Sequence, residues 1–85
     1  ILNKGDNTMN IGLHVKYYDY LGMDRYGKIT AVERSNMNPD DFYVYIEDEV
    51  PEYNIHEDMV NGVMIRYAEI RLSQNVYIDN ERSKL

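Results

Sequence analysis

Hydrophobic and polar residues alternate with a period of two along much of the chain, which is the pattern of strands that bury one face. The apolar positions of the first such segment are Leu13, Val15 and Tyr17. Residues 28–33 continue the pattern, with Ile29 and Ala31 on one face and a bulge or turn expected at Val32. Glycines and polar residues between these two segments predict a loop.

The segment 42–48, FYVYIED, shows the clearest alternation. Its apolar face carries Phe42, Val44 and Ile46, and its other face carries Tyr43, Tyr45 and Glu47. Because β-branched and aromatic residues favour strands, this segment is predicted to be the central strand, with its two tyrosines facing outward.

Residues 54–72 mix two periods. Asn54 can cap a helical turn and Glu57, three residues later, can complete a capping box, so one helical turn is predicted near 54–60. Gly62 is expected to end it. Residues 63–72 fit the spacing of a strand and of a helix, and their β-branched and aromatic content favours the strand.

These elements predict an all-β fold, a small barrel of four to six short antiparallel strands with one helical turn near 54–60. One domain is expected over residues 9–79. Residues 1–8 are expected to be a disordered extension or a non-native remnant, and residues 80–85 a frayed tail.

The order of the elements and the pattern V-x-Y…G-K-I-x-x-V…D-F-Y-V-Y-I…E-D-M-V resemble the small SH3-like barrel proteins common in phages and mobile elements. The similarity covers residues 12–72. It implies an SH3-like barrel of phage or mobile-element type, a group that includes inhibitors of host proteins.

Residues 16–20, KYYDY, match the last letters of the ALYDY signature of Src-homology domains, whose aromatic grooves hold polyproline helices. The rest of that pattern is missing, since the chain has no tryptophan and no acidic specificity loop directly after the motif. A proline-rich ligand is therefore not predicted. The tyrosines are interpreted as a strand edge that runs into a turn.

The composition limits the chain to one small hydrophobic core. The chain has 85 residues and no cysteine, so it has neither a disulfide nor a four-cysteine zinc site. No apolar run approaches the roughly 18 residues of a membrane span, and residues 1–10 lack the features of a signal peptide. A cytoplasmic location is therefore expected.

The negative charge is concentrated in the middle of the chain. The net charge is −6, and residues 35–65 contain no lysine or arginine. The eight acids of this segment are Asp40, Asp41, Glu47, Asp48, Glu49, Glu52, Glu57 and Asp58. Such a surface disfavours direct binding to nucleic acid or to anionic membranes, and it suits a basic protein partner. A solvated acidic face that keeps the protein soluble is the alternative.

Carboxylates can also imitate the phosphates of a nucleic acid. Duplex DNA carries one charge per about 1.7 Å of its axis, whereas residues on one face of a strand recur at about 6.6 Å. A mimic would therefore need acids from strands and loops together.

The candidate partner-binding residues are six acids for charge matching and two tyrosines as aromatic anchors. They are Asp40, Asp41, Tyr43, Tyr45, Glu47, Asp48, Glu49 and Glu52. Exposed tyrosines are common at protein interfaces because they combine a large rigid ring with a polar tip. The alternative is a small barrel that uses tyrosine on both faces. Stacking of single-stranded bases is disfavoured because it normally needs a basic groove.

The sequence carries no known catalytic or metal-binding signature. Nucleophile elbows, phosphate-binding loops, dinucleotide glycine motifs, paired-histidine motifs and calcium loops are all missing. His14 and His56, the only two histidines, are interpreted as an outward strand residue and a helix-turn residue. We expect no enzymatic activity, no metal and no cofactor.

The sequence therefore predicts a non-enzymatic acidic interaction protein. The expected partner is a basic nucleic-acid-binding host protein that the chain blocks, as an anti-CRISPR or anti-restriction inhibitor does, with nucleic-acid mimicry as a special form. The alternative is a structural or assembly module, such as a small virion component or a homo-oligomeric accessory protein.

Overall fold

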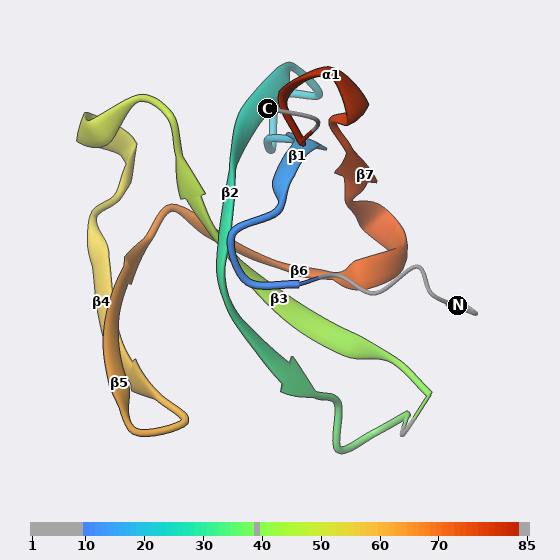
Figure 1. Cartoon of the computed structure of the whole chain (residues 1–85), viewed down its shortest axis with the longest axis vertical. Helices are drawn as coiled ribbons and strands as arrows, with labels where there is room; N and C mark the ends of the chain where they lie inside the picture. Colours follow the sequence, from blue (N-terminus) through green and yellow to red (C-terminus); the bar gives the residue numbers. More distant parts are fainter. Residues whose placement is uncertain (1–9, 39, 84–85) are drawn as a thin grey trace.

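A computed structural model describes residues 10–38 and 40–83 (Figure 1). The strands are β1 (His14–Tyr18), β2 (Asp24–Arg34), β3 (Phe42–Asp48), β4 (His56–Val60), β5 (Val63–Tyr67), β6 (Glu69–Leu72) and β7 (Tyr77–Ile78). The helical elements are the 3-10 turns η1 (Pro51–Tyr53) and η2 (Ser73–Asn75) and the short helix α1 (Asn80–Ser83). The prediction of an all-β fold is confirmed.

The strands form two antiparallel sheets. The larger has the order β6-β3-β2-β1-β7, and β4 and β5 form a separate two-stranded sheet. Figure 1 shows the β4–β5 hairpin standing to one side of the larger sheet. The larger sheet does not close into a barrel, and residues 10–38 and 40–83 contain seven strands where four to six were expected.

The first hydrophobic cluster lies on one face of the larger sheet. It contains the buried residues Val15, Tyr17, Ile29, Val44, Ile46 and Val76, with Leu13 and Val32 packed against them. The alternation predicted for residues 13–17 is therefore confirmed.

A second hydrophobic cluster lies between the larger sheet and the hairpin. It contains Ala31, Tyr45, Val60, Ile65 and Tyr67. The prediction that Tyr45 faces outward is wrong, since Tyr45 is only 8% exposed. The hairpin covers the second face of β3, and the rings of Tyr45 and Tyr67 meet edge to face with centroids 5.0 Å apart.

An irregularity in β2 distributes its side chains between the two clusters. The register between β2 and β3 shifts between Ile29 and Ala31. A bulge of this kind turns the following residues over, so Ile29 packs in the first cluster and Ala31 in the second. The bulge expected at Val32 thus lies before Ala31, and Ile29 and Ala31 do not share a face.

The helical turn expected near 54–60 lies three residues earlier. Pro51–Tyr53 forms the 3-10 turn η1, and His56–Val60 forms strand β4. Asn61 and Gly62 connect β4 to β5 with φ angles of 52° and 82°, the left-handed pair that a two-residue hairpin turn needs. Residues 63–72 are strand, as predicted, divided at Ala68 into β5 and β6.

Of the expected frayed tail, Asn80–Ser83 forms α1, which contacts β1. The extension predicted for residues 1–8 and the end of the tail, residues 84–85, lie outside the described residues. Within the described part of the chain, no helix is long and apolar enough to cross a membrane.

Candidate functional site

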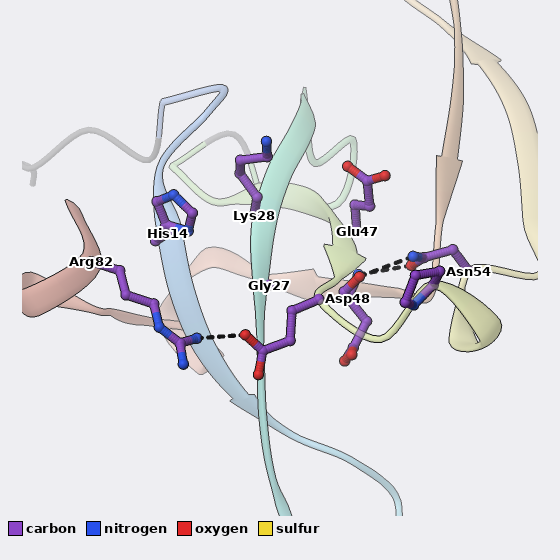
Figure 2. Close-up of a pocket in the computed structure, with 9 residues that line it drawn as sticks. His14, Gly27, Lys28, Glu47, Asp48, Asn54 and Arg82 are labelled. Atoms are coloured by element: carbon purple, nitrogen blue, oxygen red, sulfur yellow. Dashed lines mark hydrogen bonds and ion pairs between the residues drawn. The ribbon is translucent and has the colours of Figure 1, made fainter. Parts of the chain in front are cut away.

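A charged hollow lies where β3 ends, and three of the predicted site residues line it (Figure 2). Its volume is about 300 Å³. The lining residues are His14, Gly27, Lys28, Glu47, Asp48, Glu49, Pro51, Asn54 and Arg82. They come from β1, β2, β3, the η1 segment and α1, so five elements meet here.

Gly27 lets β2 pass close to β3 beside this hollow. A Cβ at this position would lie 2.3 Å from the carbonyl oxygen of Glu47 and 2.9 Å from Ile46 Cγ2. No other residue fits without moving β3, which explains a glycine in the middle of a strand.

Asp48 forms the buried wall of the hollow and is held from several directions. Arg25 donates to both carboxylate oxygens, with Nη2 to Oδ1 at 2.8 Å and Nε to Oδ2 at 3.2 Å. The hydroxyl of Tyr17 donates to Oδ2 at 2.5 Å, and the backbone N–H of Val50 donates to Oδ1 at 2.9 Å. The side chain of Asn54 bonds both the N–H and the C=O of Asp48. This network ties β1, β2, β3 and η1 together.

The network fixes the charge states of its members. Burial alone raises the pKa of Asp48, but the hydrogen bonds from Arg25, Tyr17 and Val50 outweigh burial and lower it below its ordinary value. Burial and the bond to Asp48 raise the pKa of Tyr17, so its hydroxyl stays protonated. The bond to Asp48 raises the pKa of Arg25, whose guanidinium also lies 4.0 Å from the ring centroid of Tyr53. These groups therefore stabilise the fold and keep the same protonation states near neutral pH.

The prediction that Asp48 takes part in surface charge matching is therefore wrong. Its residue exposure is 3% and its carboxylate is already paired with Arg25, 23 positions earlier in the chain. An acid at the end of a central strand can be buried when a distant cation neutralises it.

The rim of the hollow carries both signs of charge. Arg82 Nη1 lies 2.8 Å from Glu49 Oε1, and both side chains are about half exposed. Lys28 and Glu47 are direct neighbours in the ladder between β2 and β3. Figure 2 shows His14 and Arg82 on one side of Gly27 and Asp48 and Asn54 on the other.

A second hollow adjoins the first at η1 and is also lined by acids. It shares Pro51 and Asn54 with the first and adds Glu52, Glu57 and Arg66. Four glutamates therefore surround one short turn, and we call them the η1 acids: Glu47, Glu49, Glu52 and Glu57.

The acidic middle of the sequence is partly neutralised in space by arginines from both flanks. Arg25 pairs with Asp48, Arg82 with Glu49, and Arg66 with Glu57 at 3.0 Å. The last two pairs are exposed, and pairs of that kind are weak and exchangeable.

The other predicted acids lie at the far end of β3. Asp40 and Asp41 precede Phe42, so the length of β3, about 20 Å, separates them from Asp48. Asp40 is exposed and Asp41 half-buried, with Asn38 Nδ2 donating to Asp41 Oδ2 at 3.0 Å. The six predicted acids therefore do not form one surface.

Of the two predicted aromatic anchors, only Tyr43 reaches the surface, and it is half-buried. The hydroxyl of Tyr45 donates to Glu33 Oε1 at 2.8 Å. The alternative interpretation, that the fold uses tyrosine on both faces of its sheet, is correct for Tyr45, because Tyr17 packs in the first cluster and Tyr45 in the second.

The KYYDY segment is a strand edge that enters a turn, as interpreted from the sequence. Tyr17 is buried against Asp48, and the Asp19 carboxylate accepts from the N–H groups of Leu21 and Met23, both at 2.9 Å. Tyr20 is 89% exposed. Tyr17 and Tyr20 also line a separate hollow of about 270 Å³ with Tyr53.

The sequence interpretation missed six lining residues: His14, Gly27, Lys28, Pro51, Asn54 and Arg82. A glycine inside a strand pattern is a signal of close backbone approach, so Gly27 could have been found. Arg82 had no signal, because its role depends on the position of α1 beside β1.

Among the residues that the structure describes, no three histidine, aspartate or glutamate side chains gather in a way that could hold a metal ion. Compared with known proteins, the chain matches no family model, no curated protein and no solved structure.

Proposed function

We propose that this protein is a non-enzymatic binding protein and that the η1 acids dock on a basic partner. One observation carries the proposal: four glutamates from β3, the link to η1, η1 itself and β4 line two hollows that meet at this 3-10 turn, although they spread over 11 positions of the sequence. Of these four glutamates, only Glu49 and Glu57 form ion pairs within the described residues.

The two exposed ion pairs of Glu49 and Glu57 favour this function because the cations of a partner can replace their arginines. An exposed ion pair contributes about 0–1 kcal/mol, so lysines or arginines of a partner can displace Arg82 or Arg66 at little cost. The buried pair of Asp48 with Arg25 meanwhile keeps the turn in place. A rigid turn that carries exchangeable charges loses little conformational entropy on binding.

The partner in this proposal is a basic nucleic-acid-binding protein of a host cell, in a cytoplasmic setting. The chain then acts as a phage or mobile-element inhibitor of the anti-CRISPR or anti-restriction type. This assignment rests on the resemblance to small SH3-like proteins and on the acidic surface. Nucleic-acid mimicry is the special form in which the η1 acids occupy phosphate sites of the partner, so that duplex DNA competes with the chain.

The proposal is tested by capturing partners from a host lysate with two variants of equal net charge. Glu47→Lys with Glu52→Lys changes two η1 acids that have no ion pair among the described residues. Asp40→Lys with Asp41→Lys is the control at the far end of β3. We expect the first variant to lose a basic partner that the wild type and the control retain at low salt. Equal retention by all three proteins contradicts the proposal.

A second candidate function, self-assembly, is favoured by exposed apolar side chains. Tyr20, Leu21, Met37 and Ile55 are each at least two-thirds exposed. Apolar surface of this extent is typical of interfaces when it is contiguous. Light scattering distinguishes the two functions, because an assembly module exceeds the 10.1 kDa monomer without any partner.

A further inference from the structure

Strand β4 leaves one edge of the hairpin unpaired. Within residues 10–38 and 40–83, β4 pairs with β5 and with no other strand. Of the two hairpin strands, β5 packs against β2 and β3. The edges of the larger sheet are shorter, since β6 has four residues and β7 has two, against five for β4.

The register shows which backbone groups of β4 point away from β5. The two-residue turn at Asn61 and Gly62 closes on the pair of Val60 with Val63, and closing pairs of such turns are hydrogen-bonded. Bonded and non-bonded pairs alternate in an antiparallel ladder. The N–H and C=O groups of Glu57 and Met59 therefore point to the open edge.

The side chains of these two residues make the open edge chemically distinctive. Glu57 lies opposite Arg66, and Met59 lies opposite Met64. Both methionines are more than half exposed. Asp58, on the other face, accepts a hydrogen bond from the hydroxyl of Tyr67. The edge thus combines two carboxylates with an apolar methionine pair.

Natural proteins protect edge strands with charged side chains, proline, bulges or a covering element. β4 contains no proline and no bulge, and its charged side chains are the acids Glu57 and Asp58. Its two adjacent acids oppose pairing with a second copy, because an antiparallel arrangement about the strand centre places Glu57 and Asp58 opposite their own equivalents or next to them. Like charges in such positions are destabilising.

We propose that the open edge of β4 accepts an extended basic segment of a partner protein as an added strand. The main-chain groups of Glu57 and Met59 bond the segment, Glu57 and Asp58 attract its lysines or arginines, and the methionine pair receives an aliphatic side chain between them. Strand addition of this kind derives affinity from the backbone and specificity from alternate side chains. Glu57 belongs to both sites, but the proposal concerns the backbone edge of β4 and holds whether or not Glu47, Glu49 and Glu52 bind a partner.

Amide hydrogen exchange of the intact chain tests this proposal. The probe is a short capped peptide with a lysine and a valine two positions apart, which lie on the face of Glu57 and Met59, and a second lysine between them on the face of Asp58. Its control replaces both lysines by glutamate. We expect the basic peptide to slow exchange at Glu57 and Met59, while Asp58 and Val60, which already bond β5, change little. The preference over the acidic peptide is expected to be about threefold to tenfold.

Two substitutions at one position separate backbone pairing from side-chain contact. Met59→Pro removes the outward N–H and leaves the ladder to β5 intact, because proline is tolerated where the N–H faces solvent. Met59→Ala keeps that N–H. We expect Met59→Pro to weaken the basic peptide at least about tenfold relative to Met59→Ala. Glu57→Lys, which keeps the strand and its N–H, should reverse the preference toward the acidic peptide.

Three results overturn the proposal. The first is equal binding of the basic and acidic peptides by the wild type. The second is equal binding of the basic peptide by Met59→Pro and Met59→Ala. The third is a dimer by light scattering with the Glu57 and Met59 amides protected before peptide is added, which makes a second copy the occupant. The first two results do not bear on the lysate capture by the η1 acids, whereas the third favours self-assembly, the second candidate function.

Discussion

Replacing Asp48 by asparagine should destabilise the fold strongly. The substitution keeps the size of the side chain but removes the negative charge that faces Arg25. Removing one partner of a buried ion pair lowers the free energy of unfolding by about 3–5 kcal/mol. Because the Arg25 side chain remains 21% exposed, it keeps some hydration, and we expect about 3 kcal/mol.

This loss is a large part of the expected stability. Domains have about 0.05–0.15 kcal/mol per residue, or about 4–13 kcal/mol for a chain of 85 residues. With a urea dependence of about 1 kcal/mol per molar, the unfolding midpoint should fall by about 3 M. Equilibrium urea unfolding, followed by far-ultraviolet circular dichroism, measures the change.

Two further variants each remove a weaker interaction than the buried ion pair. Tyr17→Phe removes a single hydrogen bond to the carboxylate and should cost about 1.5–3 kcal/mol. Glu49→Gln breaks the exposed pair with Arg82 and should cost less than about 1 kcal/mol. A loss below 1 kcal/mol for Asp48→Asn, or one no larger than that of Glu49→Gln, refutes the assignment of the network as the anchor of η1.

The same network predicts how stability depends on acid. The folded pKa of Asp48 is lowered, so its contribution is complete above the unfolded value of about 4 and is lost as the pH falls through the folded value. The difference in free energy of unfolding between the wild type and Asp48→Asn should therefore be largest near pH 7 and narrow below about pH 4. A difference that stays constant down to pH 2 contradicts the contribution of the Asp48 charge to stability.

Further predictions follow from the second cluster and from the glycines. Burial, together with the bond to Glu33, raises the pKa of Tyr45 to about 12. The free energy of unfolding should therefore fall as the pH rises from about 10 to about 12. Tyr45→Phe should remove part of this fall in alkaline unfolding curves. In a spectrophotometric titration, the absorbance change that is lost in Tyr45→Phe should lie at the alkaline end, near pH 12, and a lost change centred near pH 10 contradicts the burial of Tyr45. Gly27→Ala should cost about 1–3 kcal/mol or more, because its Cβ meets the backbone of β3, and a thermal melt indistinguishable from that of the wild type contradicts this close approach.

Local alternation predicted the strands well because it depends only on neighbouring residues. Val15, Tyr17, Val44 and Ile46 all lie in the first cluster, as their spacing indicated. The prediction that Tyr45 faces outward failed because the β4–β5 hairpin covers the second face of β3. A period of two does not show whether the opposite face of a strand is open or covered.

The hairpin itself had a signal in the sequence. Asn61 and Gly62 form the dipeptide that favours two-residue hairpin turns, and β-branched or apolar residues flank it. Reading Gly62 as the end of a helical turn placed a helix where β4 lies. The capping box of Asn54 and Glu57 misled, because Asn54 instead bonds the backbone of Asp48.

The candidate site was predictable only in part. The concentration of acids showed that charge matters, and Glu47, Glu49 and Glu52 do lie around η1. Pairings with Arg25 and Arg82 depend on contacts across 23 and 33 positions, which no local pattern contains. The burial of Asp48 and the separation of Asp40 from the η1 acids follow from those long-range contacts and from the length of β3.

The most direct test of the central claim is the salt dependence of affinity for the captured partner. We would measure the dissociation constant by calorimetry from low to high salt for the wild type and for Glu47→Lys with Glu52→Lys. The account predicts an affinity that falls steeply with salt for the wild type, and a weaker affinity with a shallower dependence for the variant, because fewer charges meet. An affinity that is independent of salt, or the same salt dependence in both proteins, would show that the η1 acids do not make the contact.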